Sequence, residues 1–411
     1  MRPVFRGVAG ALGAAATLPF AIACGAAVRT MREVADATQR GIQLIPDVPT
    51  PAPSLGLGAA VAVDTLIAMP MRLLSSAGSP DGYAASSSEL DHAVKFYDEA
   101  GWLSDASTRH RMPPAPDDVR SLGSDARGVE SVEFASGWDP VDGEPGGDRW
   151  RSFTANATVT VRLLRHGDGP RPWLVAVHGQ GMGRPSDDRW LRMRRVHDEL
   201  GVNVALPVLP LHGPRRAGFA PEQQFVSNVF PVNNVLGVSQ AVWDVRRLVA
   251  WLRESEGASD VGVLGLSLGS YVVSVLATLD AELACVIALV PQPDLAGSLR
   301  AVDPAVPSRR RLHRDLYDER VDVIHHPVSP LSSPCAVPHE RRFIVAGQVD
   351  RIAGPEGAAQ LARHWEEASV LWRPRGHVTT CRSSVFDDHL AMVLAGCGLT
   401  AEPARRITVA R

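Results

Sequence analysis

The amino-acid sequence predicts an α/β fold, with a mostly parallel, doubly wound sheet flanked by helices. From about residue 129, short apolar runs alternate with longer runs whose apolar residues recur every three or four positions. Strands that alternate with helices of this length usually form a parallel sheet. The chain has 411 residues, of which 45% are hydrophobic and 21% charged, and this ordinary globular composition excludes wholesale disorder.

We expect three regions along the chain: an apolar N-terminal segment (1–28), a helical N-terminal extension (29–118) and the α/β domain (119–411). The run 7–28 carries no charge but is rich in Ala and Gly and contains Pro19. A signal peptide, a membrane anchor and a helix packed on the protein all remain open for it. We expect a cytoplasmic protein, with association at a membrane surface through this segment as the alternative.

The extension contains a second apolar stretch, residues 55–74, which includes Asp64 and Pro70. A carboxylate and a proline argue against a membrane span, so we interpret the stretch as an Ala-rich helix packed on the protein or lying on a membrane surface. A further helix is predicted over 88–102, with Ser88 as its cap.

The secondary structure of the α/β domain follows from the apolar patterns. Strands are predicted at 129–134, 157–164, 173–177, 202–208, 261–266, 285–290, 342–345 and 370–372. Helices are predicted at 238–252, 271–279, 358–365 and 384–394. In the first of these helices, Asp244, Arg246, Arg247 and Arg253 are expected to face mostly outward.

The strongest chemical motif is Gly265-Leu266-Ser267-Leu268-Gly269, which follows the strand 261–266 and opens a helix. A serine on such a tight strand-to-helix turn exposes its hydroxyl, and small residues on either side let the strand and helix pass closely. The helix behind it directs its positive end at a developing negative charge. In this context the pattern favours a nucleophilic serine over a plain Gly-Ser turn.

A glycine-rich turn, Gly179-Gln180-Gly181, follows the strand 173–177. Acyl transfer places a negative charge on one oxygen, and two backbone N–H groups commonly stabilise it. We expect these donors to be the amides of Leu268 and Gln180. The alternative is a glycine turn required only for its backbone geometry. His178, directly before the turn, is expected to be a structural hydrogen-bonding residue rather than a base.

An acid and a base follow two later strands. Asp350 comes after the strand at 342–345, and His377 after the one at 370–372. His377 would take the proton of Ser267 and return it to the leaving group, while Asp350 would orient the imidazole. Each residue alone could be a turn cap or a surface histidine. The three in this order, each after a separate strand, favour a catalytic triad.

With these motifs, residues 129–397 resemble the α/β-hydrolase superfamily, in particular a bacterial branch of uncharacterised esterase/lipase-like hydrolases. The proline-rich turn 206–216 and the segments 240–247 and 100–103 carry the resemblance to that branch. Ser270 departs from it, because many members have a third glycine there. The resemblance implies a serine hydrolase that cleaves carboxylic esters or related acyl bonds. An acyltransferase and a non-catalytic scaffold bound to a membrane or partner are the alternatives.

Several remaining features have two interpretations. His212, Arg215 and Arg216 could contact a substrate or lock their turn, and the second is favoured. Segments 219–234 and 291–340 are long connections and candidate lids.

The expected partner is a small-molecule or lipid ester, and oligomeric state stays open. A net charge of -3 gives no reason to expect nucleic-acid binding. His325 and His326 lack a third ligand at metal spacing, so neither a metal nor an organic cofactor is expected. The five cysteines are widely spread and are expected to be reduced thiols.

Overall fold

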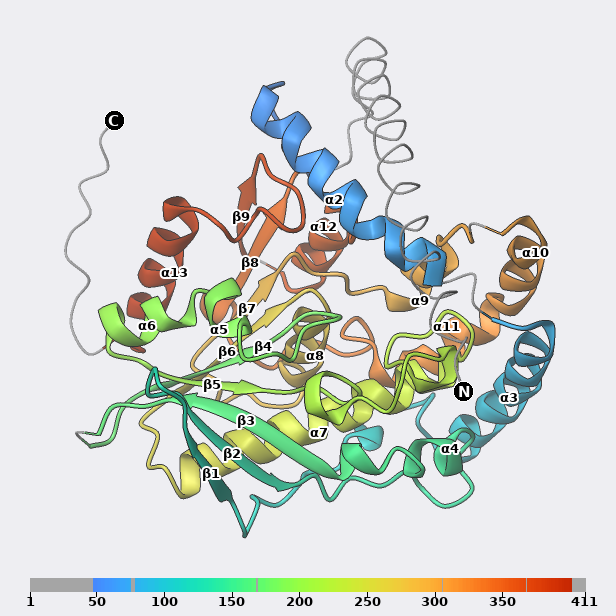
Figure 1. Ribbon diagram of the computed structural model, residues 1–411, viewed down its shortest axis with the longest axis horizontal. Helices are drawn as coiled ribbons and strands as arrows, with labels where there is room; N and C mark the ends of the chain where they lie inside the picture. Colours follow the sequence, from blue (N-terminus) through green and yellow to red (C-terminus); the bar gives the residue numbers. More distant parts are fainter. Residues whose placement is uncertain (1–46, 75–77, 168, 305, 367, 401–411) are drawn as a thin grey trace, which may run out of the picture.

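The computed structural model describes residues 47–400 apart from 75–77, 168, 305 and 367 (Figure 1). The predictions about residues 1–28 lie outside this part of the chain. In the described part, no helix is both long and apolar enough to cross a membrane.

A single mixed sheet forms the centre of the molecule, with the strand order β1-β2-β3-β5-β4-β6-β7-β8-β9. The first four strands in this order pair antiparallel, and the strands from β5 to β9 are parallel. The bounds are β1 (Arg120–Ser124), β2 (Glu130–Ala135), β3 (Thr158–Leu164), β4 (Trp173–Val177), β5 (Asn203–Pro207), β6 (Val261–Leu266), β7 (Val286–Leu289), β8 (Arg342–Gly347) and β9 (Ser369–Arg373). The predicted mostly parallel sheet is confirmed.

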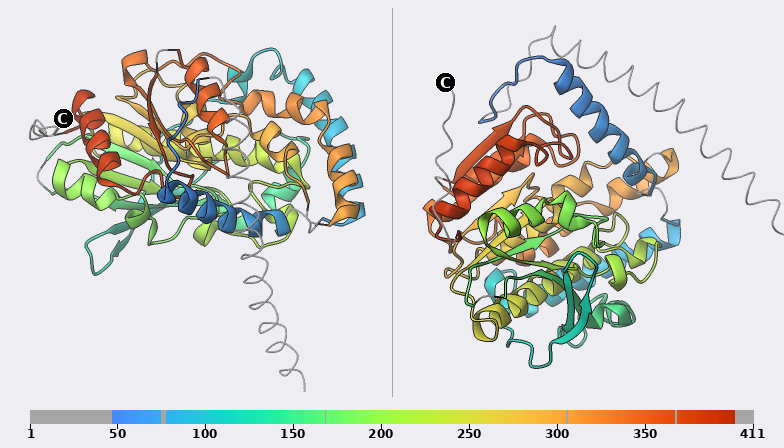
Figure 2. Two further views of the ribbon diagram at one scale, coloured as in Figure 1. Left: turned by 90° about the horizontal axis from the view of Figure 1, so that it is seen from above. Right: turned by 60° about the vertical axis from the view of Figure 1, so that its left-hand side comes forward.

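The central strands are apolar along almost their whole length because both faces of the sheet are covered. Every residue of β4 and β5 is buried. One face packs on α6 (Met193–Leu200) and α13 (Ser384–Gly396), and the other on α7 (Pro231–Glu254), α8 (Leu268–Leu276) and α12 (Pro355–His364) (Figures 1 and 2). This doubly wound arrangement, with Ser267 on the turn between β6 and α8, is the α/β-hydrolase fold.

The prediction that the charged residues of α7 face mostly outward is wrong for Asp244, Arg246 and Arg247, whereas Arg253 is half-buried. Asp244, Arg246 and Arg247 are 2%, 8% and 9% exposed. Asp244 forms an ion pair with the buried Arg215 at 2.8 Å and accepts a 2.5 Å hydrogen bond from Ser136. The helix lies between the sheet and the N-terminal segments, so both of its faces are covered, and its polar residues are buried with partners from other elements.

The extension contains two long helices, α2 (Leu55–Leu74) and α3 (Pro80–Glu99). The predicted start of the second helix at Ser88 is wrong: Ser79 caps it by accepting from the N–H of Gly82, and Pro80 occupies the first turn, where its missing N–H costs nothing. Leu90 and Tyr97 of α3 belong to the same hydrophobic core as one face of the sheet.

Shorter helices complete the fold. They are η1 (Ala106–Arg109), α4 (Gly147–Arg151), η2 (Thr154–Ala157), α5 (Asp187–Trp190), η3 (Gly213–Arg215), η4 (Pro221–Gln223), α9 (Leu295–Arg300), α10 (Pro307–Leu316), α11 (Glu319–His325), η5 (His326–Val328) and η6 (His339–Arg341). The candidate lid segment 291–340 thus contains α9, α10 and α11, and α10 and α11 pack against α3. That it covers a substrate site stays a prediction.

Candidate functional site

Ser267 occupies the turn between β6 and α8 in a backbone conformation that L-residues rarely adopt. Its φ is 53° and its ψ is -112°. The N–H of Ser267 donates to the carbonyl of Leu289 at 2.9 Å, which ties the turn to the neighbouring strand β7. Such strain persists only where the surroundings enforce it, and it commonly marks functional positions.

The two glycines of the motif are required by close packing. A Cβ on Gly265 would lie 2.2 Å from the carbonyl oxygen of Gly269, and a Cβ on Gly269 would lie 2.1 Å from that of Val177. The start of α8 therefore rests directly on the ends of β6 and β4. This contact holds Ser267 at the carboxyl edge of the sheet, where the other candidate residues also lie.

Asp350 and His377 lie on the loops that follow β8 and β9, and they are directly bonded. Nδ1–H of His377 donates to Oδ2 of Asp350 at 2.7 Å. The other carboxylate oxygen of Asp350 accepts from the amides of Ile352 and Ala353, both at 2.8 Å. The carboxylate is thus held in one orientation, and the proton of His377 is fixed on Nδ1.

The charges of this pair support each other. Burial alone would lower the pKa of His377, but the negative charge and hydrogen bond of Asp350, together with the charge of Asp64, raise it above its usual value. Burial alone would raise the pKa of Asp350, but His377 and the two backbone amides lower it. Asp350 is therefore a carboxylate at neutral pH, and His377 is a stronger base than a free imidazole.

Ser267 is half-buried, and its hydroxyl makes no hydrogen bond with the part of the chain that the structure describes. Nε2 of His377 likewise has no bonded partner among those residues. The structure thus brings Asp350 and His377 into contact and puts Ser267 at the same sheet edge, without a serine–histidine hydrogen bond. Catalytic hydrogen bonds often form only when substrate is bound.

The glycine-rich turn lies beside the serine. A Cβ on Gly179 would be 3.4 Å from the Cβ of Ser267, and Gly181 has a positive φ of 78°. Leu268 is the first residue of α8, so its N–H has no partner within the helix. Gln180 and Leu268 therefore sit on the two turns that border Ser267, and that their amides form an oxyanion site stays a prediction.

The glycine-rich turn 178–183 packs against a second buried turn, 208–216. Nδ1 of His212 lies 2.8 Å from the carbonyl oxygen of Pro210, and its Nε2 lies 3.1 Å from Oε1 of Gln180. Burial lowers the pKa of His212 to about 3, so the ring is neutral at neutral pH and carries a single N–H. His212 therefore donates to one of these two oxygens at a time, and its ring lies between the turn 208–216 and the side chain of Gln180.

His178 and Arg215 have structural contacts. Nδ1–H of His178 donates to the carbonyl of Gly179, and its Nε2 accepts from the N–H of Leu209. Arg215 is 1% exposed and donates to the carbonyls of Val208 and Asn156, both at 2.8 Å. These bonds hold the turns 178–183 and 208–216 against each other.

Sequence reasoning missed one residue of this region, Asp64 of α2. It is fully buried and accepts from the backbone amides of Arg351, His377 and Val378. A signal was present, because a single carboxylate in an otherwise apolar helix must have a polar partner when that helix packs. The partners themselves lie some 300 residues away in sequence and could not be identified.

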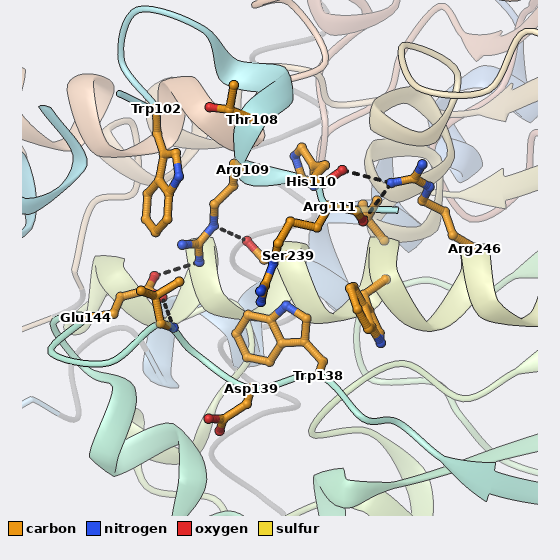
Figure 3. A pocket seen from close by; sticks show the side chains of 13 residues that line it. Trp102, Thr108, Arg109, His110, Arg111, Trp138, Asp139, Glu144, Ser239 and Arg246 are labelled. Carbon is orange, nitrogen blue, oxygen red and sulfur yellow. Dashed lines mark hydrogen bonds and ion pairs between the residues drawn. The ribbon is translucent and has the colours of Figure 1, made fainter. Parts of the chain in front are cut away.

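A cavity of about 120 Å³ lies away from Ser267, between α7 and the segment 102–112 (Figure 3). The buried Arg109 crosses it, stacked over Trp102 at 4.0 Å, paired with Glu144 at 2.6 Å and bonded to Ser239 at 3.0 Å. Arg246 donates to the carbonyls of His110 and Arg111. The buried charges that line this cavity hold the extension on α7.

The described residues include four thiols, of which those of Cys285 and Cys397 lie within hydrogen-bonding reach of each other. Cys285, Cys335, Cys381 and Cys397 are free thiols, and Cys24 lies outside the described residues. Among the residues that the structure describes, no three His, Cys, Asp or Glu side chains gather closely enough to bind a metal ion.

No family model matches this sequence. Two uncharacterised proteins of Mycobacterium tuberculosis do: that of strain CDC 1551 is 37% identical over 370 residues and that of strain H37Rv is 36% identical over the same length. In both cases the match spans 87% of this chain and 86% of the relative. The chain belongs to the family of these mycobacterial proteins. Both relatives are uncharacterised proteins, so membership of this family does not by itself indicate an activity.

Solved structures are more distant. A Thermus thermophilus protein matches with a TM-score of 0.45 and 16% identity, over 69% of this chain and all of that one. Acetyl xylan esterase 1 from Thermoanaerobacterium sp. matches with a TM-score of 0.42 and 13% identity, over 79% of this chain and 97% of that one.

Proposed function

We propose that this protein is a serine hydrolase that cleaves a carboxylic ester or related acyl bond through an acyl-enzyme. The observation that carries the proposal is the strained Ser267 at the carboxyl edge of the sheet, with the bonded pair Asp350 and His377 on the neighbouring loops of that edge. Fold alone does not fix function, so the proposal rests on these side chains.

The proposed reaction proceeds in two halves. Oγ of Ser267 attacks the carbonyl carbon while Nε2 of His377 takes its proton, and the amides of Leu268 and Gln180 bind the oxygen that becomes negative. When the intermediate collapses, His377 protonates the departing alcohol and leaves an acyl-serine. His377 then removes a proton from water while the water oxygen attacks the acyl carbon; when this second intermediate collapses, His377 returns the proton to Oγ of Ser267 and the acid is released.

Asp350 would orient this base throughout. Its 2.7 Å hydrogen bond keeps the proton of His377 on Nδ1, so that Nε2 is the atom that accepts the serine proton. Its negative charge also stabilises the imidazolium that forms in each half-reaction. No step requires a metal or an organic cofactor.

The proposal is tested with a fluorophosphonate probe and short p-nitrophenyl esters on the full chain. We expect labelling of Ser267 and ester turnover, both lost in Ser267→Ala. Ser255→Ala is the matched control, because this exposed serine ends α7 at a distance from the motif. Unlabelled wild-type protein without turnover would support a scaffold role instead, and ester formation from an added alcohol would indicate an acyltransferase.

A further inference from the structure

Helix α2 crosses the edge of the sheet at which β8 and β9 end (Figures 1 and 2). Three contacts fix the described N-terminal segment there. Gln348 donates to the carbonyl of Pro49 at 2.7 Å, Asp47 pairs with Arg363, and Asp64 lies under the loops that follow the two strands. The extension therefore touches the loops that carry Asp350 and His377.

The side chain of Asp64 contacts both loops. Its Oδ2 accepts from the N–H of Arg351 at 3.1 Å and from that of His377 at 2.6 Å. Its Oδ1 accepts from the N–H of Val378 at 3.1 Å. Arg351 directly follows Asp350, so one carboxylate links the backbone beside the acid to the backbone of the base.

The energetics favour a dedicated contact. Asp64 is fully buried and has no ion pair with any residue that the structure describes; burial raises the pKa of its carboxyl, and the hydrogen bonds from the three backbone amides offset this only in part. Burying a carboxylate costs several kcal/mol unless such bonds replace water. Hydrogen bonds from N–H groups to an ionised oxygen are about twice as strong as neutral ones. The three amides are thereby held in fixed positions.

The opposite side of the contact is shaped to fit the carboxylate. A Cβ on Gly376 would lie 2.4 Å from Oδ2 of Asp64, and the three atoms nearest to that Cβ all belong to Asp64. The φ of Gly376 is not positive, so its backbone does not require glycine. Glycine is needed there because the carboxylate occupies the space of a side chain.

From these contacts, and on the basis of the function proposed above, we propose that Asp64 is a positioning residue: from α2 it holds the loops of Asp350 and His377 in the geometry needed for proton transfer. The N-terminal extension is then part of the hydrolytic site. Asp64 does not touch the reacting atoms, and it acts through the backbone of His377.

The test compares Asp64→Asn with Asp47→Asn in the full chain. Asp64→Asn keeps the size of the side chain but removes the charge and turns one acceptor into a donor. We expect kcat/KM for a p-nitrophenyl ester to fall about 10- to 100-fold, because displacement of a catalytic group by about 1 Å has effects of that order. Asp47→Asn makes the same chemical change at an exposed ion pair and is expected to retain full activity.

Two further readouts separate positioning from simple loss of structure. The acidic limb of the pH profile of kcat/KM should move to lower pH in Asp64→Asn, because a negative charge near His377 is lost while that of Asp350 remains. Gly376→Ala should lower kcat/KM in the wild type but have much less effect in an Asp64→Ala background, where the clashing carboxylate is absent.

The outcomes separate the two proposals. If the wild type labels at Ser267 but Asp64→Asn keeps wild-type kcat/KM and an unchanged acidic limb, the role of Asp64 is wrong and the serine mechanism stands. Equal losses of kcat/KM for Gly376→Ala in the wild type and in the Asp64→Ala background would also contradict the proposed role of Asp64. If the wild type is not labelled, the serine mechanism itself fails. Circular dichroism on each variant confirms that folded proteins are compared.

Discussion

Oδ2 of Asp350 lies 2.7 Å from Nδ1 of His377, and the two side chains are only 2% and 10% exposed. In such a shielded pair, each charge strongly affects the pKa of the other group. The raised pKa of His377 has a direct kinetic consequence, because the base must be neutral to accept the serine proton.

We therefore expect kcat/KM to rise with pH through a pKa above the usual 6.5 of histidine and to level off above it. The sign follows from the direction of the shift: a raised pKa keeps His377 protonated, and inactive as a base, to higher pH. In Asp350→Asn the charge that raises this pKa is removed, and kcat should fall by about 10⁴-fold. A pH–rate profile of both proteins checks this, and an acidic limb below 6.5 in the wild type would contradict it.

The oxyanion assignment predicts a difference between two substitutions at Gln180. Gln180→Ala removes the contact with His212 but keeps the backbone N–H, so kcat should change less than about 10-fold. Gln180→Pro deletes that N–H, and loss of one oxyanion donor typically lowers kcat by about 10²- to 10³-fold. Steady-state kinetics on folded variants distinguish the two, and equal effects would mean that the amide of Gln180 is not a donor.

Close packing at the nucleophile turn predicts a stability effect. In Gly269→Ala the new Cβ would lie 2.1 Å from the carbonyl oxygen of Val177, so β4 and α8 must separate. We expect a loss of about 1–3 kcal/mol in the free energy of unfolding, measured by urea denaturation. Gly396→Ala is the control: this glycine ends α13 with nothing within 4 Å of its Cβ position, and alanine there should not destabilise the protein.

Breaking the ion pair of Arg109 and Glu144, which lies far from Ser267, should lower the free energy of unfolding more than Gly269→Ala does. Both side chains are almost fully buried, at 3% and 0% exposure, so Glu144→Ala leaves an uncompensated guanidinium in the interior. Such a change costs about 3–5 kcal/mol. Lys95→Ala breaks the exposed pair with Glu99 and should alter stability by less than about 0.5 kcal/mol. Thermal unfolding of the two variants provides the comparison. Similar melting temperatures would mean that the buried ion pair contributes no more to stability than the exposed one.

The sequence predicted those parts of the fold whose signal is local. β4 and β6 begin and end where their apolar runs do, because both are short, fully apolar and bounded by polar turns. The three residues at the strand ends could be proposed for the same reason: each directly follows a recognisable strand. For α3, the Ser79–Pro80 start was missed because the apolar pattern begins only further along the helix.

Features that depend on a distant partner could not be predicted. Asp244 is buried because it pairs with Arg215, which lies on the turn after β5. The periodicity of α7 gives no information about this partner. Asp64 is a similar case, since its three amide partners follow β8 and β9. Patterns along a chain show which residues are apolar, but not which polar residues another segment will cover.

The separation of 313 residues between Asp64 and His377 also bears on how the protein is made. The ribosome synthesises α2 about 300 residues before the loop of His377, so the carboxylate of Asp64 stays without these amide partners until that loop has been made. Contacts between such remote segments form late and slow the final assembly of a domain. A nascent chain of this protein therefore completes the surroundings of its imidazole only after the loop that follows β9 has been synthesised.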